Sequence, residues 1–245
     1  MERLGWGPRT YRSFEGSGGA RLAFRVCVET TDLYVRADRD LTAEARAAVR
    51  RVRGEIEAHI ARHPAFATAL CPLAAPDGLP EDGPVARMYR AGQAAGVGPM
   101  AAVAGTVAGA VGRRLRRWSR EVLVENGGDL YLDLTGEATV GLYAGASPFS
   151  DRLAIRVGPG DTPLGVCTSS GTVGPSLSFG RADAAVVLAG DPALADAAAT
   201  ALGNRIHSPG DLEPAVEWAL SIPGVRGAVA VLGERLAAKG RVEFV

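Results

Sequence analysis

A carboxylate and a hydroxyl lie four residues apart in the alanine-rich segment from Ala193 to Asn204. Pro192 opens this segment and Gly203-Asn204 closes it, which predicts a helix. Asp196 and Thr200 are its polar interior side chains, and residues four apart share one helix face. Such a pair of hard oxygen ligands is suited to Mg²⁺ together with carbonyls, water and a substrate phosphate, although similar pairs also occur on solvated helices.

A glycine-punctuated loop rich in hydroxyl groups follows a predicted buried strand that ends at Cys167. Its residues from Gly165 to Gly180 are Gly-Val-Cys-Thr-Ser-Ser-Gly-Thr-Val-Gly-Pro-Ser-Leu-Ser-Phe-Gly. Glycines allow backbone N–H groups to turn toward an anion or the edge of a ligand. The pattern predicts a ligand-binding loop that includes Ser170 and Thr172, or a serine-rich surface turn.

A predicted hairpin lies upstream of this loop. Glu-Val-Leu-Val-Glu at 121–125 leads through Asn126-Gly127-Gly128-Asp129 into Leu-Tyr-Leu-Asp-Leu, which is typical of two strands joined by a tight turn. An Asn-Gly turn by itself requires no function.

Four motifs make the chain similar to the ApbE superfamily: Gly96-Val-Gly-Pro-Met-Ala-Ala-Val-Ala-Gly105, Glu125-Asn-Gly-Gly-Asp129, Cys167-Thr-Ser-Ser-Gly-Thr172 and Ala195-Asp-Ala-Ala-Ala-Thr200. The characterised members are FAD:protein FMN transferases, and the chain most resembles an uncharacterised cytoplasmic branch of bacteria and archaea. The resemblance implies a cleft for FAD or another nucleotide, with Asp196 and Thr200 holding Mg²⁺. It also implies that the ligand is lined by Asn126, Gly127, Gly128, Asp129, Thr168, Ser169 and Gly171.

The chain departs from the transferase pattern in two places. The transferases carry a His-x-x-Asp-Pro-x-x-Gly segment after the hydroxyl-rich loop, whereas here Ser176–Gly180 continues through Arg181-Ala-Asp183 into a predicted strand. They also carry a lysine in the glycine-rich helix, and the segment from Ala101 to Gly112 has none. We therefore expect an ApbE-like protein with a flavin- or nucleotide-type cleft that depends on Mg²⁺, and FAD:protein FMN transfer is an alternative.

Cys167 provides an alternative of another class. Backbone N–H donors at the mouth of the loop would lower the pKa of the thiol, so Cys167 would be the catalytic residue of a thiol or persulfide sulfur-handling protein. A cysteine at the end of a strand is also commonly a small core residue. A non-catalytic binding module is the remaining alternative.

Charge and composition restrict the partners. The numbers of basic and acidic residues are equal, at 27 each, so no overall field attracts nucleic acid. The N-terminal residues include no apolar run, and the three cysteines form no CxxC motif, which predicts a cytoplasmic protein without disulfides. The uncharged segment from Ala94 to Gly112 is rich in Gly, Ala and Val and predicts a buried helix rather than a membrane span. A small-molecule or nucleotide ligand is the expected partner, and the sequence leaves open whether the chain forms a homo-oligomer.

Two further surfaces can bind or pack. Gly105 and Gly109 give the predicted glycine-rich helix a small-residue surface on which a backbone or a flat ligand can approach closely. Beyond that helix, five arginines form a cluster that either steers a phosphorylated ligand or is a solvated helix end: Arg113, Arg114, Arg116, Arg117 and Arg120.

The surrounding pattern predicts an α+β fold, with ApbE-like (T-fold-related) helices packed on a largely antiparallel sheet. We expect a single domain over 1–245, with an N-terminal β-meander and helix in 1–65, a proline-rich loop at 64–84 and a core at 85–245. Thr42 is the expected cap of the first helix. Strands are predicted at 9–15, 21–28, 32–37, 121–125, 129–134, 138–143, 152–157, 164–168, 184–189, 225–232 and 241–245, and helices from 42, from 85, over 101–112, over 193–203 and near 211–221.

Overall fold

The structure, a computed structural model, describes residues 22–172 and 178–245. The strand predicted at 9–15 and residues 173–177 of the hydroxyl-rich loop lie outside these ranges.

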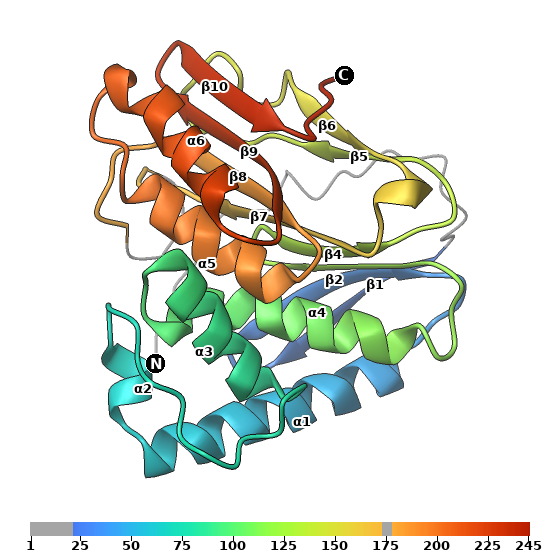
Figure 1. The fold of residues 1–245 in the computed structure, drawn as a ribbon. Helices are drawn as coiled ribbons and strands as arrows, with labels where there is room; N and C mark the ends of the chain where they lie inside the picture. Colours follow the sequence, from blue (N-terminus) through green and yellow to red (C-terminus); the bar gives the residue numbers. More distant parts are fainter. Residues whose placement is uncertain (1–21, 173–177) are drawn as a thin grey trace, which may run out of the picture.

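A single antiparallel sheet of eight strands forms the centre of the fold, in the order β1-β2-β3-β4-β7-β8-β9-β10 (Figure 1). Consecutive strands are mostly neighbours. Short hairpins join β1 to β2, β3 to β4 and β9 to β10, whereas longer connections join the other antiparallel pairs. The strands are β1 (Leu22–Val28), β2 (Thr31–Ala37), β3 (Val122–Asn126), β4 (Asp129–Asp133), β7 (Leu164–Ser169), β8 (Ala184–Ala189), β9 (Val225–Leu232) and β10 (Arg235–Gly240).

Helices cover one face of this sheet. Helix α4 packs on β3 and β4, α5 packs on β7 and β8, and α6 packs on β9, while α1 lies against β1 and α4 (Figure 1). Helix α3 packs on α5, farther from the sheet. The helices are α1 (Thr42–Arg62), α2 (Ala65–Thr68), α3 (Pro84–Ala95), α4 (Val103–Leu115), α5 (Pro192–Gly203) and α6 (Leu212–Ser221), and the 3₁₀ turn η2 (Pro99–Ala102) precedes α4.

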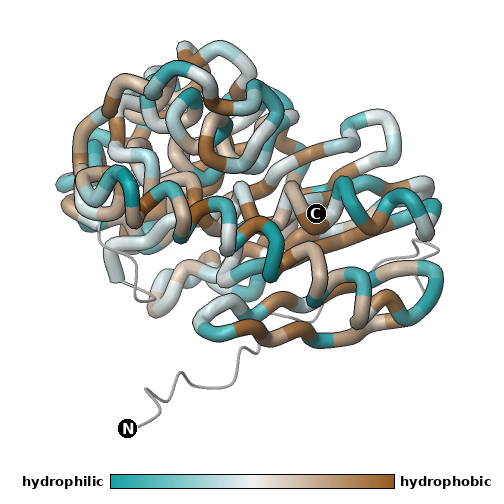
Figure 2. Tube along the Cα trace, turned by 90° about the horizontal axis from the view of Figure 1, so that it is seen from below, coloured by the Kyte–Doolittle hydropathy of each residue, from teal (hydrophilic) through white to brown (hydrophobic). Residues whose placement is uncertain are grey.

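A second layer covers the other face of the central strands. It consists of the two-stranded sheet of β5 (Ala138–Gly141) and β6 (Ala154–Val157) with the C-terminal residues, and it encloses a separate hydrophobic core. All residues of β8 are consequently buried, as expected for a strand covered on both faces. Figure 2 shows the hydrophobic residues following the strands and the hydrophilic residues gathering in connecting loops.

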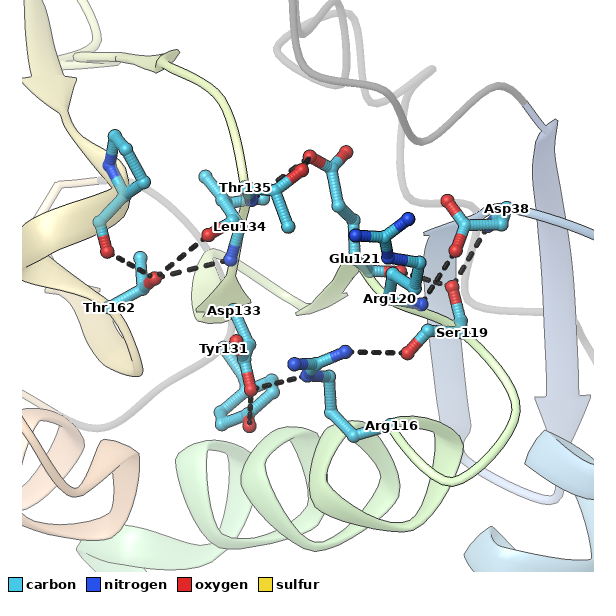
Figure 3. Close-up of polar contacts among 11 residues, drawn as sticks. Asp38, Arg116, Ser119, Arg120, Glu121, Tyr131, Asp133, Leu134, Thr135 and Thr162 are labelled. Carbon is cyan, nitrogen blue, oxygen red and sulfur yellow. Dashed lines mark hydrogen bonds and ion pairs between the residues drawn. The ribbon is translucent and has the colours of Figure 1, made fainter.

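A polar network ties the C-terminal end of α4 to the sheet (Figure 3). Arg116 donates to the Asp133 carboxylate at 2.6 Å and to the Ser119 carbonyl at 2.6 Å, and the Tyr131 hydroxyl donates to Asp133 at 3.2 Å. The Tyr131 ring also packs directly on the backbone of α4, because a Cβ placed on Gly112 would lie 2.0 Å from it. This network fixes α4 over β4.

The α+β class is confirmed, and the structure corrects some boundaries. The last strand is Arg235–Gly240 rather than 241–245, whose residues lie beside β6 and form only the isolated bridge between Ile155 and Phe244. Thr42 is the first residue of α1 and not its cap; its N–H donates to the Asp40 carboxylate at 2.9 Å. The role of Asp40 was missed because the sequence pattern predicted the helix cap two residues later, at Thr42.

No single helix within 22–172 and 178–245 is long and apolar enough to cross a membrane. The helices Pro84–Ala95 and Pro99–Leu115 reach the required length and apolar composition only when they are taken together, and they are bent by 108° relative to each other.

Candidate functional site

Two sheet strands and two helices bring the predicted site segments to one place. Leu130 pairs with Val166, so Asp129 at the start of β4 and Cys167 on β7 lie at the same end of this strand pair. Helix α5, which carries Asp196, packs on β7 and on the N-terminal part of α4. Residues from three motifs far apart in the sequence therefore meet beneath the centre of the sheet.

Asp196 is buried at the junction of α5 and α4. Its Oδ2 accepts a hydrogen bond from the backbone N–H of Gly105 at 2.8 Å, and the N–H of Ala104 also contributes. Both N–H groups belong to the first turn of α4, where backbone donors have no partner within the helix. Ala102, which precedes α4, has no side-chain acceptor, so the carboxylate of Asp196 takes the role of a cap from another helix.

Asp129 is a second buried carboxyl group of this site. Its Oδ1 has no hydrogen-bond partner among the described residues, although its other surroundings include the Cys167 thiol and the Thr168 backbone N–H. A buried polar atom without a partner is costly, and native proteins retain few of them. This atom is therefore a candidate ligand to a group that the protein binds.

Burial holds the two carboxyl groups toward their neutral forms, and at Asp129 the charge of Asp196 adds to this effect. Burial raises the pKa of Asp196 from 3.8 to about 7, with the Gly105 and Ala104 N–H groups opposing the change. Burial, followed by the charge of Asp196, raises the pKa of Asp129 well above its ordinary value. A pair of carboxyl groups perturbed in this way is typical of a ligand or metal site, although structural networks also produce it.

Glycines allow α4, α5 and β7 to approach this closely. A Cβ on Gly105 would lie 2.2 Å from the Pro192 carbonyl oxygen and 2.8 Å from the Cβ of Asp196. A Cβ on Gly165 would lie 2.5 Å from the Cα of Pro192. Neither contact is possible for a residue with a side chain, so the small-residue surface expected on the glycine-rich helix packs against the first turn of α5.

The Asn126 turn forms one side of the same site. The Asn126 amide donates to the Ala104 carbonyl at 3.1 Å, which ties the turn to the start of α4. Gly127 and Gly128 have φ values of +67° and +105°, which favour glycine. Gly128 faces β7, since a Cβ on it would lie 3.9 Å from the Thr168 carbonyl oxygen.

The hydroxyl-rich loop divides into an inner and an outer part. Ser169 is buried, and its Oγ lies toward Gly203 near the C-terminal end of α5. Thr172 is exposed; its hydroxyl donates to Asp183 at 3.0 Å, and its N–H donates to the Ser170 hydroxyl at 3.1 Å. The Gly171 N–H donates to the Ala182 carbonyl at 2.8 Å. Thr168 therefore lies beside the carboxyl groups through its backbone N–H, which faces Asp129, whereas the Ser169 hydroxyl lies at the far end of α5 and Gly171 and Thr172 are bound to the connection before β8.

Thr200 lies one helical turn beyond Asp196 on α5 and is half-buried. Within the described ranges, no group of three or more His, Cys, Asp or Glu side chains is arranged to hold a metal ion. A cation at this site would therefore rely on two carboxylates with hydroxyl, carbonyl or ligand oxygens, which is a donor set that Mg²⁺ accepts.

Cys167 is fully buried, and its thiol lies 3.5 Å from the Pro192 carbonyl oxygen. Burial, the charges of Asp129 and Asp196 and a hydrogen bond to Asp129 raise the pKa of this thiol well above its ordinary value. The N–H donors that were expected to favour a thiolate are outweighed by two neighbouring carboxyl groups. The surroundings of Cys167 thus favour a neutral thiol in the core. A neutral buried thiol favours the hypothesis of a ligand cleft over that of a sulfur-handling protein.

Sequence reasoning missed the contribution of the α4 backbone to the site. The N–H groups of Ala104 and Gly105 carry no residue-type signal, since their role follows from where α5 packs. Thr106, the next residue, has a buried hydroxyl without a hydrogen-bond partner among the described residues. The motif from Gly96 to Gly105 contained the only signal for this contact, through its glycines.

Comparisons with known proteins agree with this architecture. A protein of Methanocella arvoryzae described as "UPF0280 protein" is 47% identical over 223 residues, covering 91% of this chain and 90% of its own length. A protein of Methanosarcina acetivorans with the same description is 42% identical over 200 residues, covering 81% of this chain and 78% of its own.

The fold also resembles a solved structure, the apo form of the flavinyl transferase ApbE of Pseudomonas stutzeri, with a TM-score of 0.55 at 14% identity, covering 89% of this chain and 94% of that one. The protein family described as "AbpE bacteria" matches residues 14–222. The chain therefore belongs to this family and is an ApbE-like superfamily member.

Proposed function

We propose that the site between Asp129 and Asp196 binds Mg²⁺ together with the phosphate of a flavin- or nucleotide-type ligand. The observation that carries this proposal is the burial of two carboxyl groups from separate segments side by side, with Asp129 Oδ1 lacking a partner among the described residues. Two buried carboxylates repel each other, and a divalent cation between them would replace that repulsion by attraction.

The residues present fit a hard cation. Mg²⁺ is commonly bound by one or two carboxylates, with phosphate oxygens and water completing the coordination. Asp129 and Asp196 would supply the carboxylates, and Thr200, on the same face of α5, would supply a hydroxyl. Bound Mg²⁺ would neutralise part of the negative charge on a phosphate group.

Other residues of the site would bind and orient the ligand. The positive-φ turn at Gly127-Gly128 presents backbone without side chains, and β7 offers the Thr168 backbone N–H beside Asp129 and the Ser169 hydroxyl on the face covered by α5. The Asn126 amide, through its bond to Ala104, holds the turn against α4. Flavin is the first ligand to test because the solved structure with a similar fold is named a flavinyl transferase.

The proposal is tested by calorimetric titration of FAD into the protein with and without Mg²⁺. We expect Mg²⁺ to increase the affinity for FAD, and we expect Asp129→Asn and Asp196→Asn to remove that increase while leaving the protein folded. Asp77→Asn, which neutralises an exposed carboxylate in the loop before α3, is the matched control and should behave as wild type. An FAD affinity that is the same with and without Mg²⁺ would contradict the proposal. So would an effect of Mg²⁺ on FAD affinity that is as large in Asp129→Asn and Asp196→Asn as in the control Asp77→Asn.

A further inference from the structure

A groove separate from the Asp129–Asp196 site lies between α1, the residues leading into α3, and α4. Its volume is about 1230 Å³, above the roughly 300–1,000 Å³ of most ligand pockets. Neither Asp129, Cys167 nor Asp196 lines it. The lining is strongly cationic, with the arginines Arg50, Arg51, Arg62, Arg87, Arg113 and Arg114 against the acids Glu44, Glu55 and Asp82.

Carboxylates already neutralise two of these arginines. Arg51 pairs with Glu55 at 2.9 Å, and Arg87 pairs with Asp82 at 3.0 Å and with Asp191 at 2.9 Å. Of the other α1 arginines, Arg50 and Arg62 are exposed and solvated.

Arg113 is different because it is half-buried and unpaired. It forms no salt bridge and donates no hydrogen bond to any residue in 22–172 or 178–245, and its guanidinium folds back over Gly109 of α4, where a Cβ would lie 3.0 Å from Nη1. Buried arginines are normally paired. The charge of this guanidinium therefore lacks the close counterion that its burial calls for.

The electrostatic surroundings of Arg113 strengthen this point. Burial lowers the pKa of Arg113, the neighbouring charge of Arg87 lowers it further, and Asp191, Tyr131 and Asp82 act in the opposite direction from beyond salt-bridge distance. The guanidinium remains protonated, because an arginine pKa starts far above neutral pH. A cation that is both desolvated and close to another cation would gain free energy from an added anion.

Arg114 extends the same site toward the aromatic end of the groove. Its guanidinium carbon lies 5.1 Å from the centroid of Trp118, which also lines the groove. Arg116, three residues after Arg113, is instead occupied by Asp133 and the Ser119 carbonyl (Figure 3). The arginine cluster at the C-terminal end of α4 therefore has a structural member, Arg116, and two members at the groove without a carboxylate partner, Arg113 and Arg114.

We propose that this groove is a second ligand site, which binds a phosphate-bearing small molecule through Arg113 and Arg114. Guanidinium groups match the geometry of phosphate oxygens and bind them in pairs of parallel hydrogen bonds. Among the groove arginines without a carboxylate partner, Arg113 is the half-buried one, whereas Arg50 and Arg62 on α1 are exposed to water. A single partly desolvated guanidinium with Arg114 beside it suits a compact phosphate better than an acidic peptide, which would draw on desolvated cations along the whole groove.

The test is calorimetric titration with sodium pyrophosphate in metal-free buffer. We expect saturable binding by the wild type, weakened at least about tenfold in Arg113→Gln and less in Arg113→Lys, which keeps the charge but loses the planar fork. Arg120→Gln makes the same charge change at an exposed arginine of the same cluster that does not line the groove, so its affinity should stay within about twofold of wild type.

The Asp196→Asn variant distinguishes pyrophosphate binding in the groove from binding at the Asp129–Asp196 site. If the pyrophosphate affinity of Asp196→Asn equals that of wild type, the anion is bound outside the carboxylate site, and the Arg113 variants then test the groove independently of the result with FAD. Equal affinities of wild type and both Arg113 variants would overturn it. So would the absence of saturable pyrophosphate binding, or binding of a polyglutamate peptide in its place. Circular dichroism of each variant checks that the fold is retained.

Discussion

The carboxylate of Asp196 on α5 accepts the backbone N–H of Gly105 on α4 at 2.8 Å, and this bond joins the candidate metal ligand to the first turn of a different helix. Asp196 therefore has a structural role in the free protein in addition to the role proposed for it in ligand binding. Variants at this residue must separate the two roles.

Asp196→Ala is expected to destabilise the protein by about 1–2 kcal/mol relative to Asp196→Asn, because alanine leaves the buried Gly105 N–H without an acceptor. Asparagine retains an oxygen at the same place. Urea unfolding of the two variants measures the difference, with Asp77→Ala as an exposed control. Equal midpoints for Asp196→Ala and Asp196→Asn would show that the bond to α4 contributes nothing measurable.

Stability is expected to fall as the pH rises toward neutrality because of the same carboxyl group. The pKa of Asp196 is raised to about 7 from 3.8, so the folded state favours the protonated form. This contribution is fully present below about pH 4 and is lost by about pH 7. Unfolding free energies near pH 5 and pH 8 should differ less in Asp196→Asn than in wild type. The prediction fails if the two proteins show the same pH dependence.

Mg²⁺ affinity should change with pH in the opposite sense, since only ionised carboxylates bind the ion. It should rise with pH up to about 7 as Asp196 ionises, and Asp129, whose pKa is also raised, would contribute to the rise. Titrating Mg²⁺ at several pH values in buffers of different ionisation enthalpy measures the released protons. A flat profile would indicate that the cation binds elsewhere.

Close backbone contacts should make two glycines intolerant of alanine. Gly105→Ala and Gly165→Ala would each place a Cβ within 2.5 Å of Pro192 atoms, and overpacking of this kind costs about 1–3 kcal/mol. Gly54→Ala in α1 is the matched control; apart from the neighbouring backbone of α1 itself, nothing lies within 4 Å of its Cβ position, so it should gain about 0.5–1 kcal/mol from reduced backbone freedom. Thermal unfolding of the three variants compares them directly.

Alkylation should distinguish the cysteines. Cys27 and Cys71 are exposed, whereas Cys167 is buried with a raised pKa. Iodoacetamide at neutral pH is therefore expected to label the exposed pair in the native protein and to reach Cys167 only after unfolding. Rapid labelling of native Cys167, read by peptide mass spectrometry, would revive the thiol alternative.

The fold was largely predictable because its elements are local. The start of α1 at Thr42, the Asn126 turn and the Pro192 and Gly203 boundaries of α5 are all signals within one segment, and the structure has each of them. The final strand was misplaced because 241–245 alternates polar and apolar residues and Arg235–Gly240 does not, so that only pairing with β9 identifies Arg235–Gly240 as the strand.

The candidate site was predictable in part. Resemblance to known motifs pointed to Asp129 and Asp196, and the structure places them together. The cap from Asp196 to α4 and the unpaired charge of Arg113 depend on how helices pack, and they have no counterpart in local spacing. The sequence also left open which arginines of the cluster are available to a phosphorylated ligand. Only the structure shows that Arg116 is bound to Asp133 and that Arg113 is not.

The strands that carry the site, β4 and β7, lie in the interior of the sheet, with helices on one face and the β5–β6 layer on the other. Their amide hydrogens should exchange with solvent only when the whole domain opens, on the slowest timescale of the molecule. The Gly127-Gly128 turn and the outer part of the loop at Thr172 are at the surface and should exchange quickly. Ligand binding should therefore slow deuterium uptake at these two surface segments, while uptake in β4 and β7 stays low with and without ligand. Occupancy of the site can then be followed without attaching a dye or probe to the protein.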